Sequence, residues 1–341
     1  MKNIELPQHD DSLIRHIWLS NALTPVISVS LELGLFESLA IKPLSLHELS
    51  TQLGLDSDVT EALTATLGGA SLIQNNTDSF ALTPVSRSYL LRDSPFYWGP
   101  MISWFKEVQP THDSLIEILR QRKPATMGDG VPLTTGWEEN SMSAERARTI
   151  TSAMHSHSLA SALGLAQQLT LPENCQVLDL GGGSACFSIA LAAKNKSVAF
   201  TVADLPIVCE VTQGYINHFS MQKRIKTHAL DMFKQQWPVG YDVIFAANVF
   251  HDWDKAQCQF LLQNARQSLK KGGEILIYEM LIDENQAGPL TAGLFSVTML
   301  HITKGKQFRA SELAAMLTEA GFSEPQTQPI YSGYSLTRAK A

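Results

Sequence analysis

A histidine and a glutamate in this chain stand where acid–base chemistry could be carried out. His251 lies in the run Phe-His-Asp-Trp at 250–253, directly after a predicted strand at 241–247, and Glu279 ends the next predicted strand. The carboxyl ends of neighbouring parallel strands meet at one edge of an α/β sheet, where ligands bind. We therefore expect Glu279 to accept a hydrogen bond from one imidazole nitrogen of His251, which leaves the other nitrogen as a base.

A glycine-rich turn at the end of an earlier predicted strand indicates a site for a nucleoside-bearing cofactor. Residues 177–183 read Val-Leu-Asp-Leu-Gly-Gly-Gly, and Asp204 stands 21 residues after Gly183, at the end of a second apolar run. Glycines let the backbone approach a ligand closely, and a carboxylate at about this spacing binds a ribose in Rossmann-type units. We therefore expect the turn and Asp204 to hold the same nucleoside.

The residues around this turn favour S-adenosylmethionine over a dinucleotide. Cys186 occupies the position of the third glycine of a dinucleotide turn, and Asp179 precedes the first glycine, Gly181, by two residues. A carboxylate there would repel a pyrophosphate but attract the ammonium and sulfonium groups of S-adenosylmethionine. Asp231, in Asp-Met-Phe at 231–233, follows another predicted strand and is either a carboxylate that meets the adenine or a helix N-cap.

Composition and length restrict the class of protein. The chain has 341 residues, so two domains are expected, and 44% hydrophobic with 17% charged residues describe a well-buried globular protein. A net charge of −7 disfavours nucleic acid as a partner. The sequence shows no apolar run of membrane-spanning length, no signal-peptide pattern and no metal-ligand spacing among its four cysteines. We expect a cytoplasmic protein with no metal site and no membrane partner.

Two halves of the chain show different patterns. As far as about residue 170 the apolar spacing is helical, with one predicted hairpin at 71–74 and 79–82, and three helices before a hairpin are typical of a winged-helix fold. The expected recognition helix, at 56–62, carries three acids and no base, which favours a packing and dimerisation role over DNA binding.

From about residue 172 strands and helices alternate, which predicts a doubly wound α/β domain. Its strands are expected at 176–180, 198–203, 225–229, 241–247 and 273–279, with a final pair within 324–338, and its helices include 184–194, 255–269 and 310–320.

Four motifs in a fixed order give the chain a family resemblance. They are Asp-x-Gly-Gly-Gly at 179–183, Asp-Leu-Pro at 204–206, Asp-Met-Phe at 231–233 and Phe-His-Asp-Trp at 250–253. With them the chain resembles the plant caffeate/hydroxyindole type of S-adenosylmethionine-dependent O-methyltransferase (class I), in its bacterial small-molecule branch. The resemblance implies a mostly α-helical, winged-helix-like dimerisation domain at 1–165. It also implies a Rossmann-like catalytic domain at 166–341 with a mixed, mostly parallel sheet.

The resemblance also implies an activity and roles for individual residues. A homodimer would methylate a hydroxyl of a small aromatic secondary metabolite of phenolic or polyketide type, with His251 as general base and Glu279 as the carboxylate that orients it. The donor would be bound by Ser158, Asp179, Gly181, Gly183, Asp204, Leu205, Asp231, Met232, Phe233 and Trp253. The acceptor pocket would be lined by Trp104, Met154, Phe250, Asp252, Met280, Phe295 and Met299.

The chain departs from the family pattern at three positions. Ala185 replaces the last glycine of the turn, Ala247 replaces a basic residue four before the histidine, and Gln307 replaces a second carboxylate. A phenol of pKa ~10 and a histidine of pKa ~6.5 differ by roughly 3.5 units, or about 5 kcal/mol for full proton transfer. The loss of a carboxylate is expected to lower the basicity of His251, which favours an unusually acidic phenol or proton loss during attack on the methyl group.

Three other functions compete with this one. An enzyme of the same fold could bind S-adenosylmethionine without transferring its methyl group, as a pericyclase, decarboxylase or hydroxylase. A ligand-sensing winged-helix regulator is disfavoured by the acidic helix at 56–62, and a dehydrogenase is disfavoured by Asp179 and Cys186.

Overall fold

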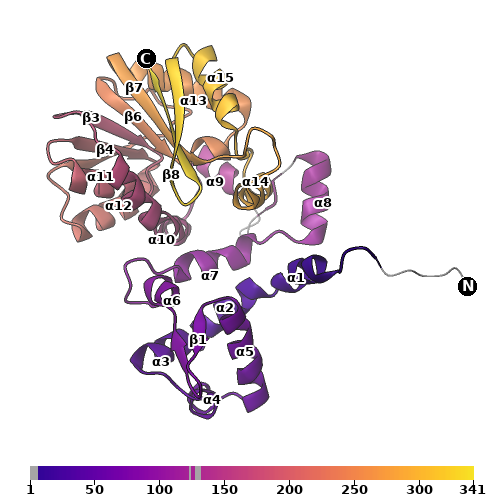
Figure 1. Ribbon diagram of the computed structural model, residues 1–341. Helices are drawn as coiled ribbons and strands as arrows, with labels where there is room; N and C mark the ends of the chain where they lie inside the picture. The colour runs from indigo at the N-terminus through magenta and orange to yellow at the C-terminus, as the bar shows by residue number, and fades with distance from the viewer. Residues whose placement is uncertain (1–6, 123, 127–131) are drawn as a thin grey trace, which may run out of the picture. The chain divides into compact units, whose positions relative to one another are not determined.

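The computed structural model describes residues 7–122, 124–126 and 132–341, and it divides the chain into two compact units, Met1–Ser103 and Trp104–Ala341 (Figure 1). The boundary expected from the sequence, after residue 165, falls inside helix α10 (Ala144–Gln168). This helix packs against α11 (Cys186–Lys194) and α12 (Pro206–His218) of the second unit. The helices just before the sheet therefore belong to the same compact unit as the sheet.

The first unit is helical with one small hairpin. Local sequence signals set several of its boundaries: Ser45 and Glu48 form a reciprocal capping box at the start of α4, and Gly54 ends that helix in the left-handed conformation. The predicted hairpin is confirmed, because β1 and β2 pair antiparallel with Ile73 opposite Leu82. The elements are α1 (Ser12–Ser20), α2 (Leu23–Glu32), α3 (Leu35–Ile41), α4 (Leu46–Leu53), α5 (Ser57–Gly69), β1 (Ile73–Asn75), β2 (Phe80–Leu82) and α6 (Pro84–Tyr89).

A compact apolar core holds this unit together. Leu35, Phe36 and Leu39 of α3 are fully buried against Leu49 of α4 and Leu67 of α5. Helix α1 is the exception, since none of its residues is buried. Its large apolar side chains face solvent within this chain: Leu13, Ile14, Ile17, Trp18 and Leu19.

The second unit contains the predicted mixed sheet, with strand order β5-β4-β3-β6-β7-β9-β8. Pairs from β5 to β7 are parallel, and β9 runs antiparallel to both β7 and β8. The strands are β3 (Gln176–Leu180), β4 (Ala199–Asp204), β5 (Ile225–Ala229), β6 (Tyr241–Ala247), β7 (Leu269–Met280), β8 (Ser323–Tyr331) and β9 (Tyr334–Lys340). The remaining helices are α7 (Gly99–Val108), α8 (His112–Gln121), α9 (Leu133–Glu138), α13 (Lys255–Ser268), α14 (Leu290–Ile302) and α15 (Ala310–Glu319).

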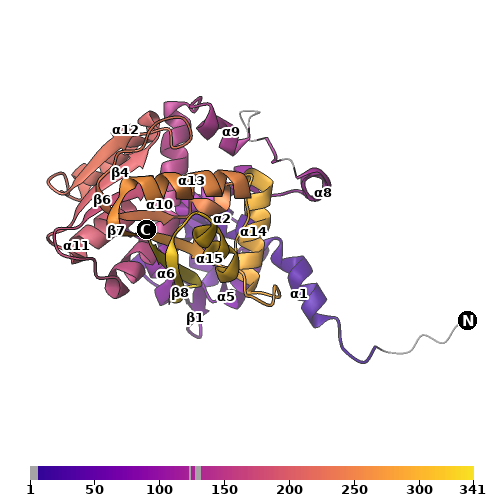
Figure 2. The ribbon, with the colours of Figure 1, turned by 90° about the horizontal axis from the view of Figure 1, so that it is seen from above.

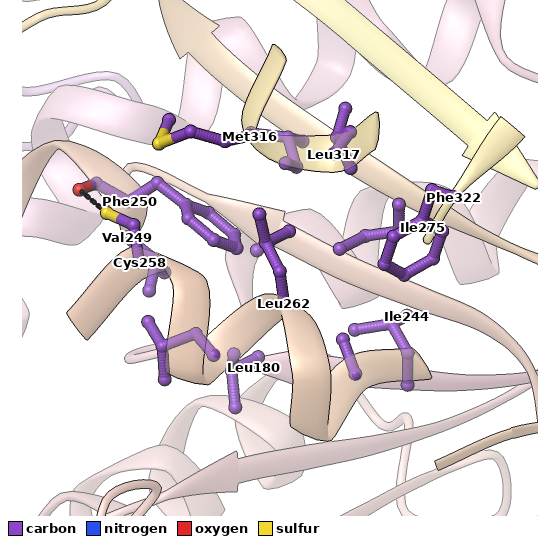
Figure 3. Close-up of a cluster of buried hydrophobic side chains, with 14 of the residues drawn as sticks. Leu180, Ile244, Val249, Phe250, Cys258, Leu262, Ile275, Met316, Leu317 and Phe322 are labelled. Atoms are coloured by element: carbon purple, nitrogen blue, oxygen red, sulfur yellow. Dashed lines mark hydrogen bonds between the residues drawn. The ribbon is translucent and has the colours of Figure 1, made fainter. Parts of the chain in front are cut away.

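Helices cover both faces of the sheet (Figures 1 and 2). Leu180 and Ile244 point toward α13 and α15, where they pack with Leu262 and Leu317 (Figure 3). Neighbouring residues point the other way: the ring of Phe245 packs 5.6 Å from Phe187 of α11. Burial on both faces is expected for a mostly parallel sheet.

Among the described residues, no single helix is long and apolar enough to cross a membrane, although one bent pair, Ser12–Glu32 with Leu35–Ile41, has the length and composition when taken together.

Candidate active site

The glycine turn follows β3 at the carboxyl edge of the sheet, and its backbone is in a conformation that requires glycine at several positions. Gly181 and Gly183 have φ values of +61° and +53°, which side-chain-bearing residues rarely adopt. A Cβ at Gly182 would lie 2.8 Å from both Asp179 and Val202, so only glycine fits there. Ala185, at the position expected to be glycine, also has a left-handed conformation, with φ +62°. This conformation costs a non-glycine residue about 1–2 kcal/mol.

Asp204 ends β4 beside this turn and fixes its backbone. One carboxylate oxygen accepts a hydrogen bond from the Gly183 N–H at 2.9 Å, and the other accepts one from the Leu205 N–H at 2.8 Å. Burial raises the pKa of Asp204 to about 6. Because a carboxylate has about four lone-pair sites, two remain for the hydroxyls of a ribose. The geometry therefore fits the role expected for Asp204.

Asp179 is oriented differently from Asp204. Its side chain is almost fully buried, and its Oδ2 accepts a hydrogen bond from Ser188 Oγ of α11 at 2.5 Å. Burial raises the pKa of Asp179 to about 7, and the charge of Asp204 adds to this effect. The side chain thus ties the strand that leads into the turn to the following helix.

The Asp-Met-Phe segment forms a turn at the end of β5. Asp231 Oδ1 accepts hydrogen bonds from the N–H groups of Phe233 and Lys234, at 3.1 and 3.2 Å, so it caps this turn. The Phe233 ring lies edge-on to Trp253 at 4.6 Å, and Trp137 of α9 lies 6.0 Å from Trp253 on another side. The indole N–H of Trp253 is buried without a partner among the described residues, which leaves one donor for a bound group.

His251 lies in a buried network of polar side chains. It sits in a short 3-10 turn, Phe250–Asp252, after β6, and its Nδ1 is 2.9 Å from Glu279 Oε2 of β7. The expected contact between the two residues is therefore present. Gln307 Nε2 is also 2.9 Å from His251 Nδ1, and Asp252 Oδ1 is 3.7 Å from Nε2. When Nδ1 carries its proton, the amide of Gln307 must turn by 180° to present its oxygen as the acceptor.

The charges around His251 make it more basic than a free imidazole. Burial alone would lower its pKa, but the carboxylates of Glu279 and Asp252, together with the hydrogen bonds that His251 makes with Glu279 and Gln307, raise the pKa of His251 to about 9. Burial raises the pKa of the Asp252 carboxyl to about 7, although the neighbouring His251 acts to lower it. His251 is therefore basic although Gln307 carries no charge, because Glu279 and Asp252 supply the negative charge.

Glu279 and Gly305 hold the backbone of the His251 segment. Glu279 Oε1 accepts from three successive N–H groups, those of Val249, Phe250 and His251, at 3.0–3.4 Å. Gly305 packs directly on this segment, since a Cβ there would lie 2.1 Å from the His251 carbonyl oxygen. One carboxylate therefore both orients the imidazole and fixes the backbone that carries it.

The residues expected around the acceptor are divided between the site and the core. Phe295 of α14 lies edge-on to His251, with ring centroids 5.3 Å apart, and is partly exposed, as are Met154 and Met280. Phe250 is 1% exposed and belongs to the core beneath α13, where Cys258 Sγ contacts its carbonyl (Figure 3). Trp104 and Met299 are also buried.

Several contacts of the site were not predicted from the sequence. Thr212 Oγ1 donates to the Gly183 carbonyl at 2.6 Å, and Ser188 holds Asp179. Glu138, next to Trp137, accepts from Lys304 Nζ at 2.6 Å and from Gln257 Nε2 at 2.8 Å. These are ordinary polar residues, most of them on helices, and no local pattern distinguishes them before the fold is known.

Fold and site together define a Rossmann-like class I methyltransferase, and comparison with known proteins gives its family. Residues 114–323 match the family model of an O-methyltransferase domain, and residues 13–92 match an O-methyltransferase dimerisation domain. The chain therefore belongs to the S-adenosylmethionine-dependent O-methyltransferases. The dimerisation domain supports a homodimer.

Individual relatives agree with this family. The chain is 30% identical to 3-hydroxy-5-methyl-1-naphthoate 3-O-methyltransferase of Streptomyces sahachiroi, over 91% of this chain and 88% of the relative. It is 30% identical to acetylserotonin O-methyltransferase of Bos taurus, over 96% and 97%. Human N-acetylserotonin methyltransferase in complex with its donor superposes with a TM-score of 0.82 at 23% identity, covering 98% of this chain and 99% of the other, which shows the shared fold.

Proposed function

We propose that the protein transfers the methyl group of S-adenosylmethionine to a hydroxyl of a small aromatic acceptor, with His251 as the general base. The observation that carries this proposal is the buried pair of His251 and Glu279, 2.9 Å apart, in a segment that also contains the donor-site candidate Trp253. Since Nδ1 faces Glu279, Nε2 is the nitrogen that receives the proton of the acceptor.

The glycine turn and the residues near it would hold the donor. Asp204 would bind the ribose hydroxyls with its two remaining acceptor sites, and Met232, Phe233 and Trp253 would enclose the adenine. Two observations support a donor site here: the left-handed backbone conformation of the glycine turn, and the indole N–H of Trp253, which has no partner among the described residues. We assign the remaining donor contacts to Ser158, Asp179, Gly181, Gly183, Leu205 and Asp231. The bound donor supplies an electrophilic methyl carbon on a positively charged sulfur.

The basicity of His251 supports direct proton removal. A phenol of pKa ~10 and an imidazole of pKa about 9 differ by roughly one unit, or about 1.4 kcal/mol, whereas an ordinary histidine leaves about 5 kcal/mol. The acceptor hydroxyl gives its proton to Nε2, its oxygen bonds to the methyl carbon, and the carbon–sulfur bond breaks. The same basicity means that His251 is protonated at neutral pH and must lose that proton before each turnover.

The class of acceptor comes from chemistry and from the relatives. Phe295 offers an aromatic surface beside His251, and the partly exposed Met154 and Met280 would add apolar surface to the acceptor site, which suits a flat aromatic ring. The relatives named above are an O-methyltransferase of a hydroxynaphthoate and one of acetylserotonin. We therefore propose a phenolic, polyketide-type or hydroxyindole acceptor. The cytoplasmic location and the metal-independent reaction expected from the sequence remain predictions.

A product assay tests the proposal. The purified protein is incubated with methyl-labelled S-adenosylmethionine and a panel that contains 3-hydroxy-5-methyl-1-naphthoate, N-acetylserotonin and simple naphthols, and products are located by mass spectrometry and NMR. We expect an O-methylated aromatic and an equal amount of S-adenosylhomocysteine from at least one acceptor. Tight binding of the donor, with a changed acceptor but no transferred label, would contradict methyl transfer and favour an enzyme that rearranges or decarboxylates its substrate.

A further inference from the structure

One side chain of α10 makes a direct contact with the glycine turn. His155 Nδ1 lies 2.8 Å from Ser184 Oγ, and Ser184 is the residue directly after Gly183. Ser184 is almost completely buried, so its hydroxyl has little access to water. The contact connects two segments that are 29 residues apart in the chain.

The imidazole of His155 is held in a fixed orientation. Its ring stacks on Tyr215 of α12, with centroids 4.4 Å apart and an angle of 29° between the planes, and Phe219 lies 6.3 Å away. Burial lowers the pKa of His155 to about 4, and the nearby His218 adds to this effect. The ring is therefore neutral in the physiological range, and its bond to Ser184 joins two uncharged groups.

The shape of the glycine turn is set by contacts from outside it. Three of its five residues from Gly181 to Ala185 have positive φ values. Glycine adopts many backbone conformations about equally well, so Gly181 and Gly183 do not fix this one by themselves, and at Ala185 it costs about 1–2 kcal/mol. The turn is held by Asp204 of β4 on the Gly183 N–H, by Thr212 of α12 on the Gly183 carbonyl, and by His155 of α10 on Ser184. Each contact comes from a different element and reaches a different group of the turn.

We propose that His155 is a positioning residue for the methyl donor: through Ser184 it keeps the glycine turn in the shape that accepts the donor. This inference rests on the proposed donor site at the turn. The same helical turn of α10 carries Met154, expected at the acceptor, and Ser158, expected at the donor. His155 thereby also fixes the helix segment that presents both residues.

Two substitutions separate the hydrogen bond from ring packing. His155→Phe keeps a ring on Tyr215 but removes Nδ1, whereas His155→Asn loses the ring and places a polar atom near the Nδ1 position. We expect His155→Phe to weaken the binding of S-adenosylhomocysteine about fivefold to tenfold in calorimetry, as for one lost buried hydrogen bond. His155→Asn should bind it within about threefold of the unchanged protein. For both variants we expect kcat at saturating donor to stay within about twofold, so that the loss appears in the KM for the donor.

A double-mutant cycle with Ser184→Ala gives the decisive comparison. In the Ser184→Ala background, His155→Phe should change the affinity for S-adenosylhomocysteine by less than about twofold, because the contact is already lost. His218→Ala, which removes an exposed histidine of the same cluster, is the control and should bind as the unchanged protein does. Undiminished affinity in His155→Phe, or an equal loss in both backgrounds, would overturn the inference. Failure of the unchanged protein to bind S-adenosylhomocysteine would instead contradict the donor site itself.

Discussion

At the scale of single residues, the proposed chemistry depends on how much negative charge surrounds His251. Glu279 and Asp252 are both carboxyl residues near the ring, and the pKa of His251 is raised to about 9 although burial opposes this. Gln307 contributes a hydrogen bond without a charge. The imidazole of His251 is therefore more basic than that of a free histidine and is mostly protonated at neutral pH.

The first prediction concerns pH. For an acceptor phenol with pKa above 10, kcat/KM should rise about tenfold per pH unit up to about pH 9, because only the deprotonated imidazole can accept the proton. Gln307→Glu adds a buried negative charge beside Nδ1 and should move this limb to higher pH. Gln307→Met, of similar size and without a hydrogen bond, should move it to lower pH. Initial-rate profiles between pH 6 and 10 measure all three.

A flat profile across this range, or a shift toward lower pH in Gln307→Glu, would show that His251 does not control proton removal. The sulfonium of the donor is a cation and would itself lower the pKa of His251. The limb measured for kcat is therefore expected below the limb measured for kcat/KM at low donor concentration.

Some contacts of the candidate site residues were predictable from the sequence, and others were not. The pairing of His251 with Glu279 was predictable because both residues end adjacent parallel strands, whose carboxyl ends lie together. The partner of Asp179 was not, since its hydrogen bond to Ser188 depends on how α11 folds back over the turn. The raised pKa of His251 also required the structure, because the sequence does not give the distance to Asp252.

At the scale of elements, the loops after β3 and β6 depend on glycines that let backbones touch. Gly305 is the tightest case near His251, since its missing side chain leaves room for the His251 carbonyl. The strands that lead to these loops were readable from the sequence: the predicted ranges 225–229 and 241–247 agree with β5 and β6. β7 begins at Leu269 rather than 273 because Leu269 pairs with Tyr241 across an irregularity in the ladder.

The second prediction tests this close packing. Gly305→Ala places a methyl group 2.1 Å from the His251 carbonyl oxygen and should displace the whole segment at 250–253. We expect it to lower the free energy of unfolding by about 1–3 kcal/mol and to reduce kcat more than donor affinity. Denaturant unfolding and steady-state kinetics measure the two effects.

Gly214→Ala is the matched control, because Gly214 lies within α12 with no atom within 4 Å of an added Cβ. It should raise the free energy of unfolding by up to about 1 kcal/mol, through helix propensity, and leave kcat unchanged. Equal behaviour of the two variants would mean that the segment after β6 tolerates displacement.

At the scale of the whole molecule, the first unit carries an unpartnered apolar helix. α1 has no buried residue, and it lies within the part of the chain that matches an O-methyltransferase dimerisation domain. Each buried large apolar side chain contributes about 1.5–3 kcal/mol. A second copy of the chain that packed on α1 would therefore gain stability by covering surface that this chain alone leaves in water.

The third prediction follows from this surface. Ile14 and Trp18 are one helical turn apart on α1, so Ile14→Glu combined with Trp18→Glu places two charges on one face. We expect this variant to sediment as a monomer at micromolar concentration, where the unchanged protein sediments as a dimer. Val239→Glu, another exposed apolar position, is the control and should leave the dimer intact. A dimer that survives the double substitution would exclude α1 from the interface.

The most direct test of the proposed mechanism is a single-turnover measurement on His251→Ala with saturating donor. We predict that methyl transfer to a phenol of pKa ~10 falls about 100-fold or more, while affinity for S-adenosylhomocysteine stays within a few-fold of the unchanged protein. With a nitrophenol that is already ionised at neutral pH, the loss should be much smaller, because no base is needed. Transfer to the ordinary phenol at an undiminished rate would contradict His251 as the general base.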